Sequence, residues 1–285
     1  MRDAVSEGDH RDQRRRSSGT GDDGGPRGAR RCSPSMTAPQ VRAPSLAAVP
    51  WPGCFRTGRF DRVNAYVGGI DLVDIPPGRV TLSDRRTQRS WSVEVGPYRL
   101  GAVPVTRSQY AQVTGCRPDG SPGDRLPADS ISWNEAVLFC NALSEHDGLT
   151  PAYRVGADGE VTRVASAGGY RLPTEAEWEH ACRAGTTGPR YGRLDDIARY
   201  RENSDDRLPE VRTRRPNAWG LYDMLGTVWE WCWDLYDPEV YGSYRVLRGG
   251  GWFDEHWSCR ASVRRRSHPT VRLDDIGFRV ARSAS

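Results

Sequence analysis

The stretch RLPTEAEWEHACRAG, residues 171–185, carries the clearest structural signal in the sequence. Thr174 and Glu177 have the spacing of a capping box, in which two side chains satisfy free backbone amides at the start of a helix. Trp178 begins an apolar face with helical spacing, and Gly185 is a typical stop signal. The stretch therefore predicts a short amphipathic helix enclosed by loops.

Two more helices are expected upstream. The segment SWNEAVLFCNALSEHDG, residues 132–148, repeats the capping-box pattern with Ser132 and Glu135 and ends at Gly148. A weaker helical pattern runs over residues 106–113. These segments predict two or three helices in all.

Short strands are expected before these helices. Residues 72–84 predict two strands joined by a Pro-Pro-Gly turn, and residues 91–95 and 98–103 predict a second pair separated by Gly96 and Pro97. The strands do not alternate with helices, so a parallel α/β series is excluded. About half of the chain remains as loop rich in Gly, Pro and Trp, and long loops in a compact domain usually carry function.

Composition describes an ordinary globular chain. The protein has 285 residues, of which 36% are hydrophobic, and this is sufficient for a sizeable core. It has no apolar run of about 18 residues and no apolar segment behind its N-terminal charges, so neither a spanning helix nor a secretory signal is expected. We therefore expect a cytoplasmic monomer with no membrane partner.

Residues 1–50 are predicted to form a disordered tail, because they contain almost no large apolar side chains. Its run Arg14–Arg16 could be an arm for nucleic acid or anionic membrane, but the interspersed acids favour a solvated tail. A chain start at Met36 is a further alternative. Residues 51–285 show no repeat and no long linker, and are interpreted as one domain.

The net charge of +4 comes mostly from this tail, since residues 1–42 contain nine Arg against six Asp and Glu, a balance of +3. The rest of the chain is nearly neutral, which argues against nucleic-acid binding by the folded part. The odd number of cysteines, without a repeated CxxC pattern, argues against a disulfide framework and against a zinc site. The seven are Cys32, Cys54, Cys116, Cys140, Cys182, Cys232 and Cys259.

The stretch at 171–185 resembles the hallmark of the formylglycine-generating enzyme family, also called the sulfatase-modifying factor family. Further blocks resemble the family in the same order, from about residue 66 to residue 282. They are IPPG (75–78), PVTRSQY (104–110), ISWNEAVLFCNAL (131–143), PNAWGLYDMLGTVWEW (216–231), RVLRGGGW (245–252), CRASVR (259–264) and IGFRVAR (276–282).

The resemblance implies an α+β fold that is similar to a C-type lectin, with a small antiparallel sheet, two or three helices and extensive irregular loops. Such a fold buries many loop peptides, which need partners, and many indoles. Most of its tryptophans are therefore expected in the core. These are Trp133, Trp178, Trp219 and Trp231, while Trp229 also matches the tryptophan that lines the oxygen pocket of the family.

A structural calcium site is implied by the resemblance. Carried over residue by residue, its ligands would be the side chains of Asp223 and Glu230 and the carbonyls of Gly226 and Val228. Two carboxylates with carbonyls between them suit a hard cation. Thr227 stands where the family usually has Asn. The alternative is that the two carboxylates pair with nearby arginines.

The oxidase chemistry of the family uses two cysteines that hold copper(I) as a dithiolate, which suits soft thiolate ligands. Cys259 matches the second cysteine, but Asp254 occupies the first position, and a carboxylate is a poor donor for copper(I). Gly251 replaces the serine of the family's RGGS block. Cys259 itself could equally be a buried, inert residue on a strand.

His256 lies three residues from Cys259 and could serve as a base or ligand, although a lone surface histidine is usually neither. Together with Asp254, Glu255 and His268 it could form an iron site, if all four converged. The sulfoxide-forming branch of the superfamily takes its histidines from a separate helical bundle, for which the preceding residues offer no room.

Two functions follow from these patterns. The first is oxidation of a cysteine in a sulfatase-like protein or peptide to formylglycine, through Cys259, with Asp254 and His256 nearby and Trp229 lining the oxygen pocket. The second is a non-catalytic binding module that uses residues 253–275, where aromatic and arginine side chains favour an interface. A structural role beside another enzyme is a third possibility.

Overall fold

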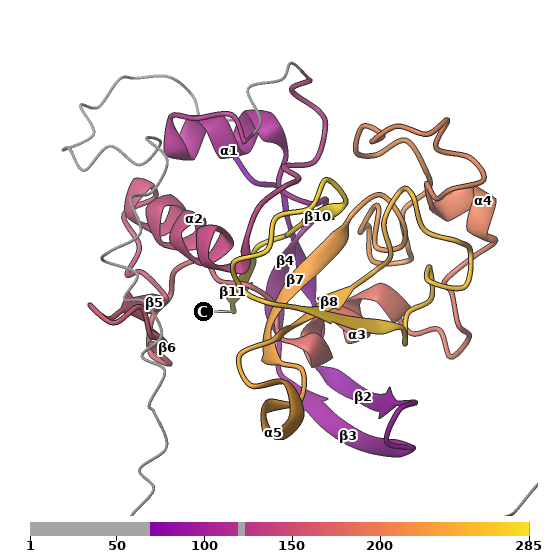
Figure 1. Cartoon of the computed structure of the whole chain (residues 1–285), viewed down its shortest axis with the longest axis horizontal. Coiled ribbons are helices and arrows are strands. Elements are labelled where there is room, and N and C mark those ends of the chain that lie inside the picture. The colour runs from indigo at the N-terminus through magenta and orange to yellow at the C-terminus, as the bar shows by residue number, and fades with distance from the viewer. Residues whose placement is uncertain (1–68, 119–122, 285) are drawn as a thin grey trace, which may run out of the picture. The chain divides into compact units, whose positions relative to one another are not determined.

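The computed structural model describes residues 69–118 and 123–284 (Figure 1). The predicted tail at residues 1–50 and the possible start at Met36 lie outside the described residues. Within the described part of the chain, no helix is both long and apolar enough to cross a membrane.

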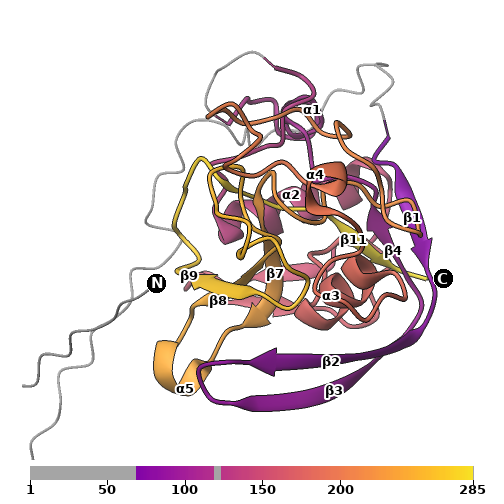
Figure 2. The same cartoon turned by 90° about the vertical axis from the view of Figure 1, so that its right-hand side faces the viewer.

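The N-terminal strands form close to where the sequence predicts them, but the expected pair on either side of Gly96 and Pro97 is wrong, because those two strands pair with other partners. Strands β1 (Leu72–Ile75) and β4 (Tyr98–Gly101) pair antiparallel, and β11 (Ala281–Ser283) joins the other side of β4. Strands β2 (Gly78–Asp84) and β3 (Arg89–Val95) form a separate two-stranded hairpin, which runs along one border of the domain in Figure 2. Alternate side chains of β2 are buried, whereas β3 is mostly exposed.

A four-stranded sheet holds the candidate site. Its order is β10 (Ile276–Gly277), β7 (Trp229–Leu235), β8 (Arg245–Arg248) and β9 (Arg264–Ser267). β10 runs parallel to β7, and the other two pairings are antiparallel. The expected small antiparallel sheet is thus several small sheets, one of them mixed. A further short hairpin joins β5 and β6 at Tyr153–Val155 and Val161–Arg163.

All three expected helices are present: α1 (Arg107–Thr114), α2 (Trp133–His146) and α3 (Glu175–Arg183). Each begins with a capping box, including α3, whose N-cap is Thr174. The helix α3 ends with Ala184 in the left-handed region (φ 43°), one residue before the expected glycine stop. This strained cap is closed by a bond from the Ala184 amide to the His180 carbonyl.

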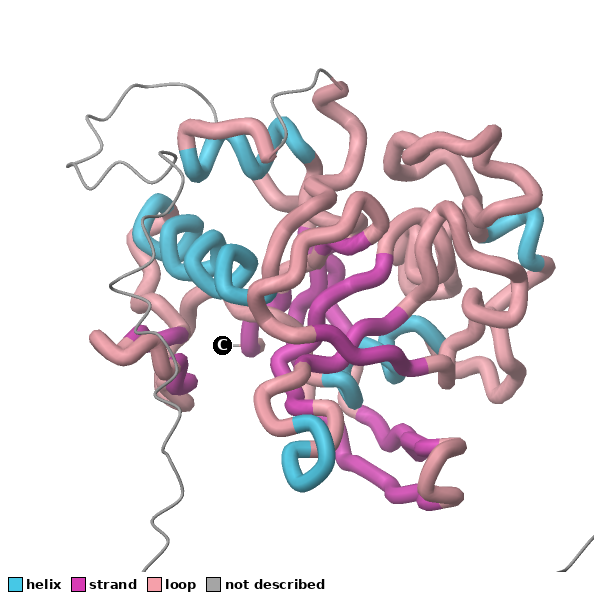
Figure 3. Tube along the Cα trace, in the orientation of Figure 1, coloured by secondary structure: helices cyan, strands magenta, loops and turns pink. Residues whose placement is uncertain are grey.

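Two four-residue helices were not expected, α4 (Leu194–Ile197) and α5 (Pro238–Tyr241). They are too short to give a periodic sequence pattern. Irregular segments connect the elements over much of the described chain, as the loops in Figure 3 show.

The core consists of two clusters of buried side chains. One lies around α3, β2 and the 194–225 segment, and the other joins α1 and α2 to β7 and the C-terminal strands. Stacked and edge-on rings of Tyr110, Phe139 and Phe278 connect α1 and α2 to the last segment. The expected core tryptophans Trp133, Trp178 and Trp231 are buried, and so is Trp229. Trp219 is only partly buried and lies edge-on to His180.

Buried arginine-carboxylate pairs hold the loops to this core. Arg248 on β8 donates to Glu179 and to the carbonyl of Ala261, and Arg264 donates two bonds to Glu175 at 2.7 Å. Such pairs give buried loop carbonyls and carboxylates the partners they need.

Candidate functional site at the end of strand β8

The loop that follows β8 carries most of the predicted site residues. It leaves the sheet through Gly249 and Gly250, both with positive φ, at 103° and 87°. A Cβ atom on Gly250 would lie 3.0 Å from the sulfur of Cys259 and 3.3 Å from the backbone of Ser258. Only glycine therefore lets the backbone pass so close over the thiol.

Asp254 has a full set of partners. Its Oδ2 accepts hydrogen bonds from Trp229 Nε1 at 2.5 Å and from the amide of Gly251 at 2.9 Å. Its Oδ1 forms an ion pair with Arg265 on β9 at 3.0 Å, and that guanidinium also lies 4.7 Å from the Trp229 ring centre. The carboxylate is therefore fixed by three donors and neutralised by an arginine.

Asp275 lies beside Gly251 and leaves little room for a side chain at position 251. A Cβ on Gly251 would lie 3.0 Å from Asp275 Cβ and 3.3 Å from Asp254 Oδ2. A serine there would crowd both carboxylates. Burial, reinforced by the charges of Asp254 and Asp274, raises the pKa of Asp275 to about 6. The two departures from the family pattern thus occur together around one pair of carboxylates.

Cys259 is completely buried, as one alternative from the sequence predicts, but it lies in a loop and not on a strand. Burial and then the charge of Asp254 raise the pKa of its thiol to about 12, against smaller opposing effects such as that of Arg190. The protonated thiol is neither a good nucleophile nor a good metal ligand at neutral pH.

These residues do not fit a copper(I) dithiolate. The site offers one buried thiol, Cys259, and the position of the first cysteine holds the carboxylate of Asp254, which Trp229, Gly251 and Arg265 already satisfy. A hard, neutralised oxygen donor does not replace a thiolate for a soft ion. Copper binding by Cys259 remains a prediction that this donor set disfavours.

His256 lies in the same loop as Cys259 but at the surface, whereas Cys259 is buried. The histidine is half-exposed, packs edge-on to Trp257, and has Nδ1 3.5 Å from Glu202. Within the described residues, Glu202, Glu255 and His256 have ligand atoms that lie within 4.8 Å of one another. Asp254 and His268 are not part of this group, so the four candidate iron ligands do not form one cluster.

Glu230 of the expected calcium site is paired with arginine. The guanidinium of Arg279 donates to both carboxylate oxygens at 2.7 Å, and Trp178 Nε1 donates at 2.7 Å. All three side chains are fully buried. Both oxygens of Glu230 are thus occupied, which agrees with the alternative prediction that this carboxylate pairs with an arginine.

Asp223 is more open to a cation. Its Oδ2 accepts a bond from the Arg212 amide at 2.7 Å, whereas its Oδ1 and the hydroxyl of Thr227 are buried without a partner. Burial raises the pKa of Asp223 to about 6. With the carbonyls of Gly226 and Val228 this leaves fewer oxygen ligands than calcium usually takes. The expected set of four therefore does not fit calcium as a whole.

Aromatic side chains cover the outer side of the same loop. Phe253 and Trp257 are 57% and 54% exposed, and Trp252 packs edge-on to Phe253. Arg201 lies 5.5 Å from the Phe253 ring centre and pairs with Glu255 at 2.8 Å. We call Arg201, Trp252, Phe253, Glu255 and Trp257 the aromatic loop face.

Two residues of the site were not predicted, Arg265 and Asp275. Arg265 belongs to the run RRRS on β9, where period-two alternation places it opposite in direction to its neighbours. That pattern could have separated its role from that of Arg264. No sequence signal shows that Asp275 lies beside Gly251, because their contact depends on the path of two loops.

The chain matches the sulfatase-modifying factor enzyme 1-like domain over residues 65–284. It is 28% identical to the chaperone protein LppX of Paenibacillus barcinonensis, over 75% of this chain and 89% of that protein. It is 30% identical to the formylglycine-generating enzyme of Streptomyces coelicolor, over 64% of this chain and 60% of the enzyme.

Among solved structures, the Treponema denticola variable protein 1 is similar in fold, with a TM-score of 0.68 and 30% identity. The match covers 75% of this chain and 95% of that protein.

Proposed function

The chain belongs to the sulfatase-modifying factor enzyme 1-like family, and we propose that this member binds a polypeptide at the aromatic loop face without oxidising a cysteine in it. The observation that carries the proposal is the fixed state of Asp254. It fills the position of the first copper cysteine, and Trp229, Gly251 and Arg265 hold its carboxylate. The reaction of the formylglycine-generating branch needs a metal-binding thiol pair there.

The state of Cys259 supports the same function. A thiol whose pKa is raised to about 12 is almost wholly protonated at neutral pH, and its side chain has no exposure to solvent. The negative charge of Asp254 contributes to that shift. The substitution at position 254 therefore removes one thiolate and disfavours the other.

The composition of the aromatic loop face supports a polypeptide ligand. Large aromatic side chains and arginine are enriched where proteins bind each other, because they bury much area at a low entropic cost. Phe253 and Trp257 are exposed within five positions of each other, and Arg201 and Glu255 provide polar groups beside them. An extended peptide can supply both apolar side chains and backbone hydrogen-bond partners to such a surface.

The absence of oxidation can be tested directly. Full-length protein is incubated with a Cys-x-Pro-x-Arg peptide, copper(I), a reductant and oxygen, and the peptide mass is followed. We expect no aldehyde. Aldehyde that forms with the wild type and is lost in Cys259→Ser would overturn the proposal and establish an oxidase. The paired substitution of Asp254→Cys with Gly251→Ser serves as a test for gain of activity.

Binding is tested with peptides selected from a random display library on the immobilised protein. We expect the selected peptides to lose roughly tenfold or more in affinity with Trp257→Ala or Phe253→Ala. Trp91→Ala is the matched control, because Trp91 is an exposed tryptophan on β3. Selected peptides that bind all variants equally, or a library that yields no binders, would contradict the proposal.

A further inference from the structure

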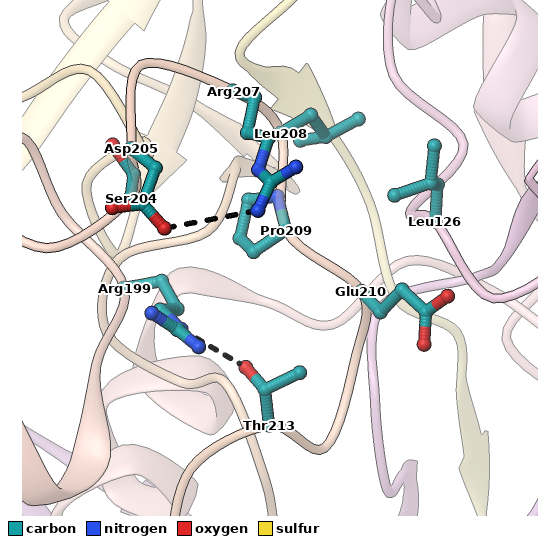
Figure 4. Close-up of a pocket in the computed structure, with 9 residues that line it drawn as sticks. All are labelled: Leu126, Arg199, Ser204, Asp205, Arg207, Leu208, Pro209, Glu210 and Thr213. Carbon is teal, nitrogen blue, oxygen red and sulfur yellow. Dashed lines mark hydrogen bonds and ion pairs between the residues drawn. The ribbon is translucent and has the colours of Figure 1, made fainter.

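A pocket near the candidate site plays no part in the proposed function. It has a volume of about 620 Å³ and opens between the loop at 199–213 and Leu126 (Figure 4). The nine lining residues are Leu126, Arg199, Ser204, Asp205, Arg207, Leu208, Pro209, Glu210 and Thr213. Its volume falls within the range of small-molecule sites in proteins.

Arg199 gives the pocket an uncompensated positive charge. Its Nε donates to Thr213 Oγ1 at 3.3 Å and its Nη1 to the carbonyl of Asn203 at 2.7 Å, as Figure 4 shows for Thr213. In the described part of the chain Arg199 has no carboxylate within ion-pair distance. These two bonds fix the guanidinium and leave Nη2 available for a ligand.

The other charges of the lining have partners of their own. Arg207 lies 3.8 Å from Asp205, and Glu210 lies 3.2 Å from Arg125, which is outside the lining. Each pair is close to neutral. The field inside the pocket therefore comes mainly from Arg199, which favours an anion.

Ser204 supplies the second indication of a ligand. The residue is only 3% exposed and lines the pocket, yet its hydroxyl has no hydrogen-bond partner. A buried hydroxyl without a partner costs free energy, which a ligand oxygen in the pocket would recover. The hydroxyl can donate to an anionic oxygen, and so it complements the free Nη2 of Arg199.

The wall of the pocket is held in place by its backbone. The carbonyl of Arg199 accepts a bond from the Thr227 amide at 2.8 Å, and a Cβ on Gly226 would lie 2.1 Å from that carbonyl oxygen. The amide of Arg201 donates to the carbonyl of Asp254 at 3.0 Å. A fixed wall lowers the entropy cost of binding.

From these observations we infer that the pocket binds a small organic acid. Its carboxylate or phosphate group is held by Nη2 of Arg199 and the hydroxyl of Ser204. Its carbon chain lies against the apolar surfaces of Leu126, Leu208 and Pro209. A guanidinium suits both kinds of oxyanion, and the apolar side chains favour an organic ligand over a bare inorganic ion.

The test follows backbone amide NMR signals of the ¹⁵N-labelled full chain during titration with three probes. Succinate and glycerol phosphate carry the two kinds of oxyanion, and succinamide is the uncharged analogue of succinate. We expect saturable shifts of amides in residues 199–213 with at least one anion and none with succinamide. The two anions distinguish a carboxylate from a phosphate ligand.

Variants then connect the shifts to the assigned groups. We expect Arg199→Gln to weaken binding roughly tenfold and Ser204→Ala to weaken it about threefold. Arg154→Gln is the control, because Arg154 is an exposed arginine on β5. The inference is overturned if neither anion saturates, if succinamide gives the same shifts, if the shifts lie outside residues 199–213, or if Ser204→Ala and Arg199→Gln both bind as the wild type does.

Discussion

Glu230 and Asp254 are held by the same two kinds of donor, an indole and an arginine, in two different surroundings. Glu230 receives Trp178 and Arg279 in the fully buried core. Asp254 receives Trp229 and Arg265 near the surface, where the arginine is half-exposed. The same arrangement therefore stabilises the buried core at Glu230, whereas at Asp254 it occupies the position that resembles the first copper cysteine of the family.

Substitution of the buried carboxylate, Glu230, should give the largest loss of stability. Glu230→Gln keeps the volume but leaves the buried Arg279 without a countercharge, so we expect a loss of about 3–5 kcal/mol in the free energy of unfolding. Urea denaturation measures it. Glu94→Gln breaks an exposed pair with Arg79 and should cost less than about 1 kcal/mol. Equal losses of stability in Glu230→Gln and Glu94→Gln would contradict the expected difference between the buried pair with Arg279 and the exposed pair with Arg79.

Substitution of Asp254, which lies nearer the surface, should lower the stability less. Asp254→Asn removes the ion pair with Arg265 but keeps an oxygen that can accept from Trp229 and Gly251, and the arginine can reach water. We expect a loss of about 1–2 kcal/mol, measured by the same urea denaturation. A loss as large as that of Glu230→Gln would mean that Asp254 is also a core staple.

The pH dependence of stability should report on the two neighbouring carboxylates Asp254 and Asp275. Burial and the charge of Asp254 raise the pKa of Asp275 to about 6, above its value of about 3.9 in the unfolded chain. The stability contributed by such a group is complete below the unfolded value and is lost as the pH rises through about 6.

We therefore expect Asp275→Asn to become more stable relative to the wild type as the pH rises from about 4 to about 7. Denaturation at both pH values measures the difference. In the variant Asp254→Asn, carboxyl NMR titration should show a lower pKa for Asp275. A stability difference that does not change with pH would contradict the burial of this group.

Calcium should have the smallest effect, because Arg279 already supplies the positive charge that Glu230 needs. We expect calcium addition or chelation to shift the melting temperature by less than about 1 °C at calcium concentrations near 1 mM. A larger rise with calcium that is lost in Asp223→Asn would show that the loop binds the ion in spite of that pairing.

Local elements could be predicted from the sequence, because their signals lie within a few residues. The capping boxes at Ser132 and Thr174 and the Pro-Pro-Gly turn each identify an element without reference to the rest of the chain, whereas the capping box at Thr106 was seen only in the structure. The family resemblance then supplied the fold class. The four-residue helices α4 and α5 gave no signal of comparable strength.

The candidate site was predicted only in part. The position of Asp254 beside Trp229 followed from the family blocks, and the structure brings both together. The partners Arg265 and Asp275 come from separate segments, and which arginine meets which acid depends on tertiary packing. The exposure of His256 likewise depends on the turn of one loop.

The last described segment ties three distant parts of the chain together. β10 pairs with β7, β11 pairs with β4, and Arg279 between them donates to the carbonyl of Gly101, 178 positions away. Contacts across such a distance form late, because a long loop must close before any of them is made. The sheet of β1 and β4 therefore has an unpaired edge until the segment at 276–283 docks, and refolding should be slow and sensitive to aggregation at that edge.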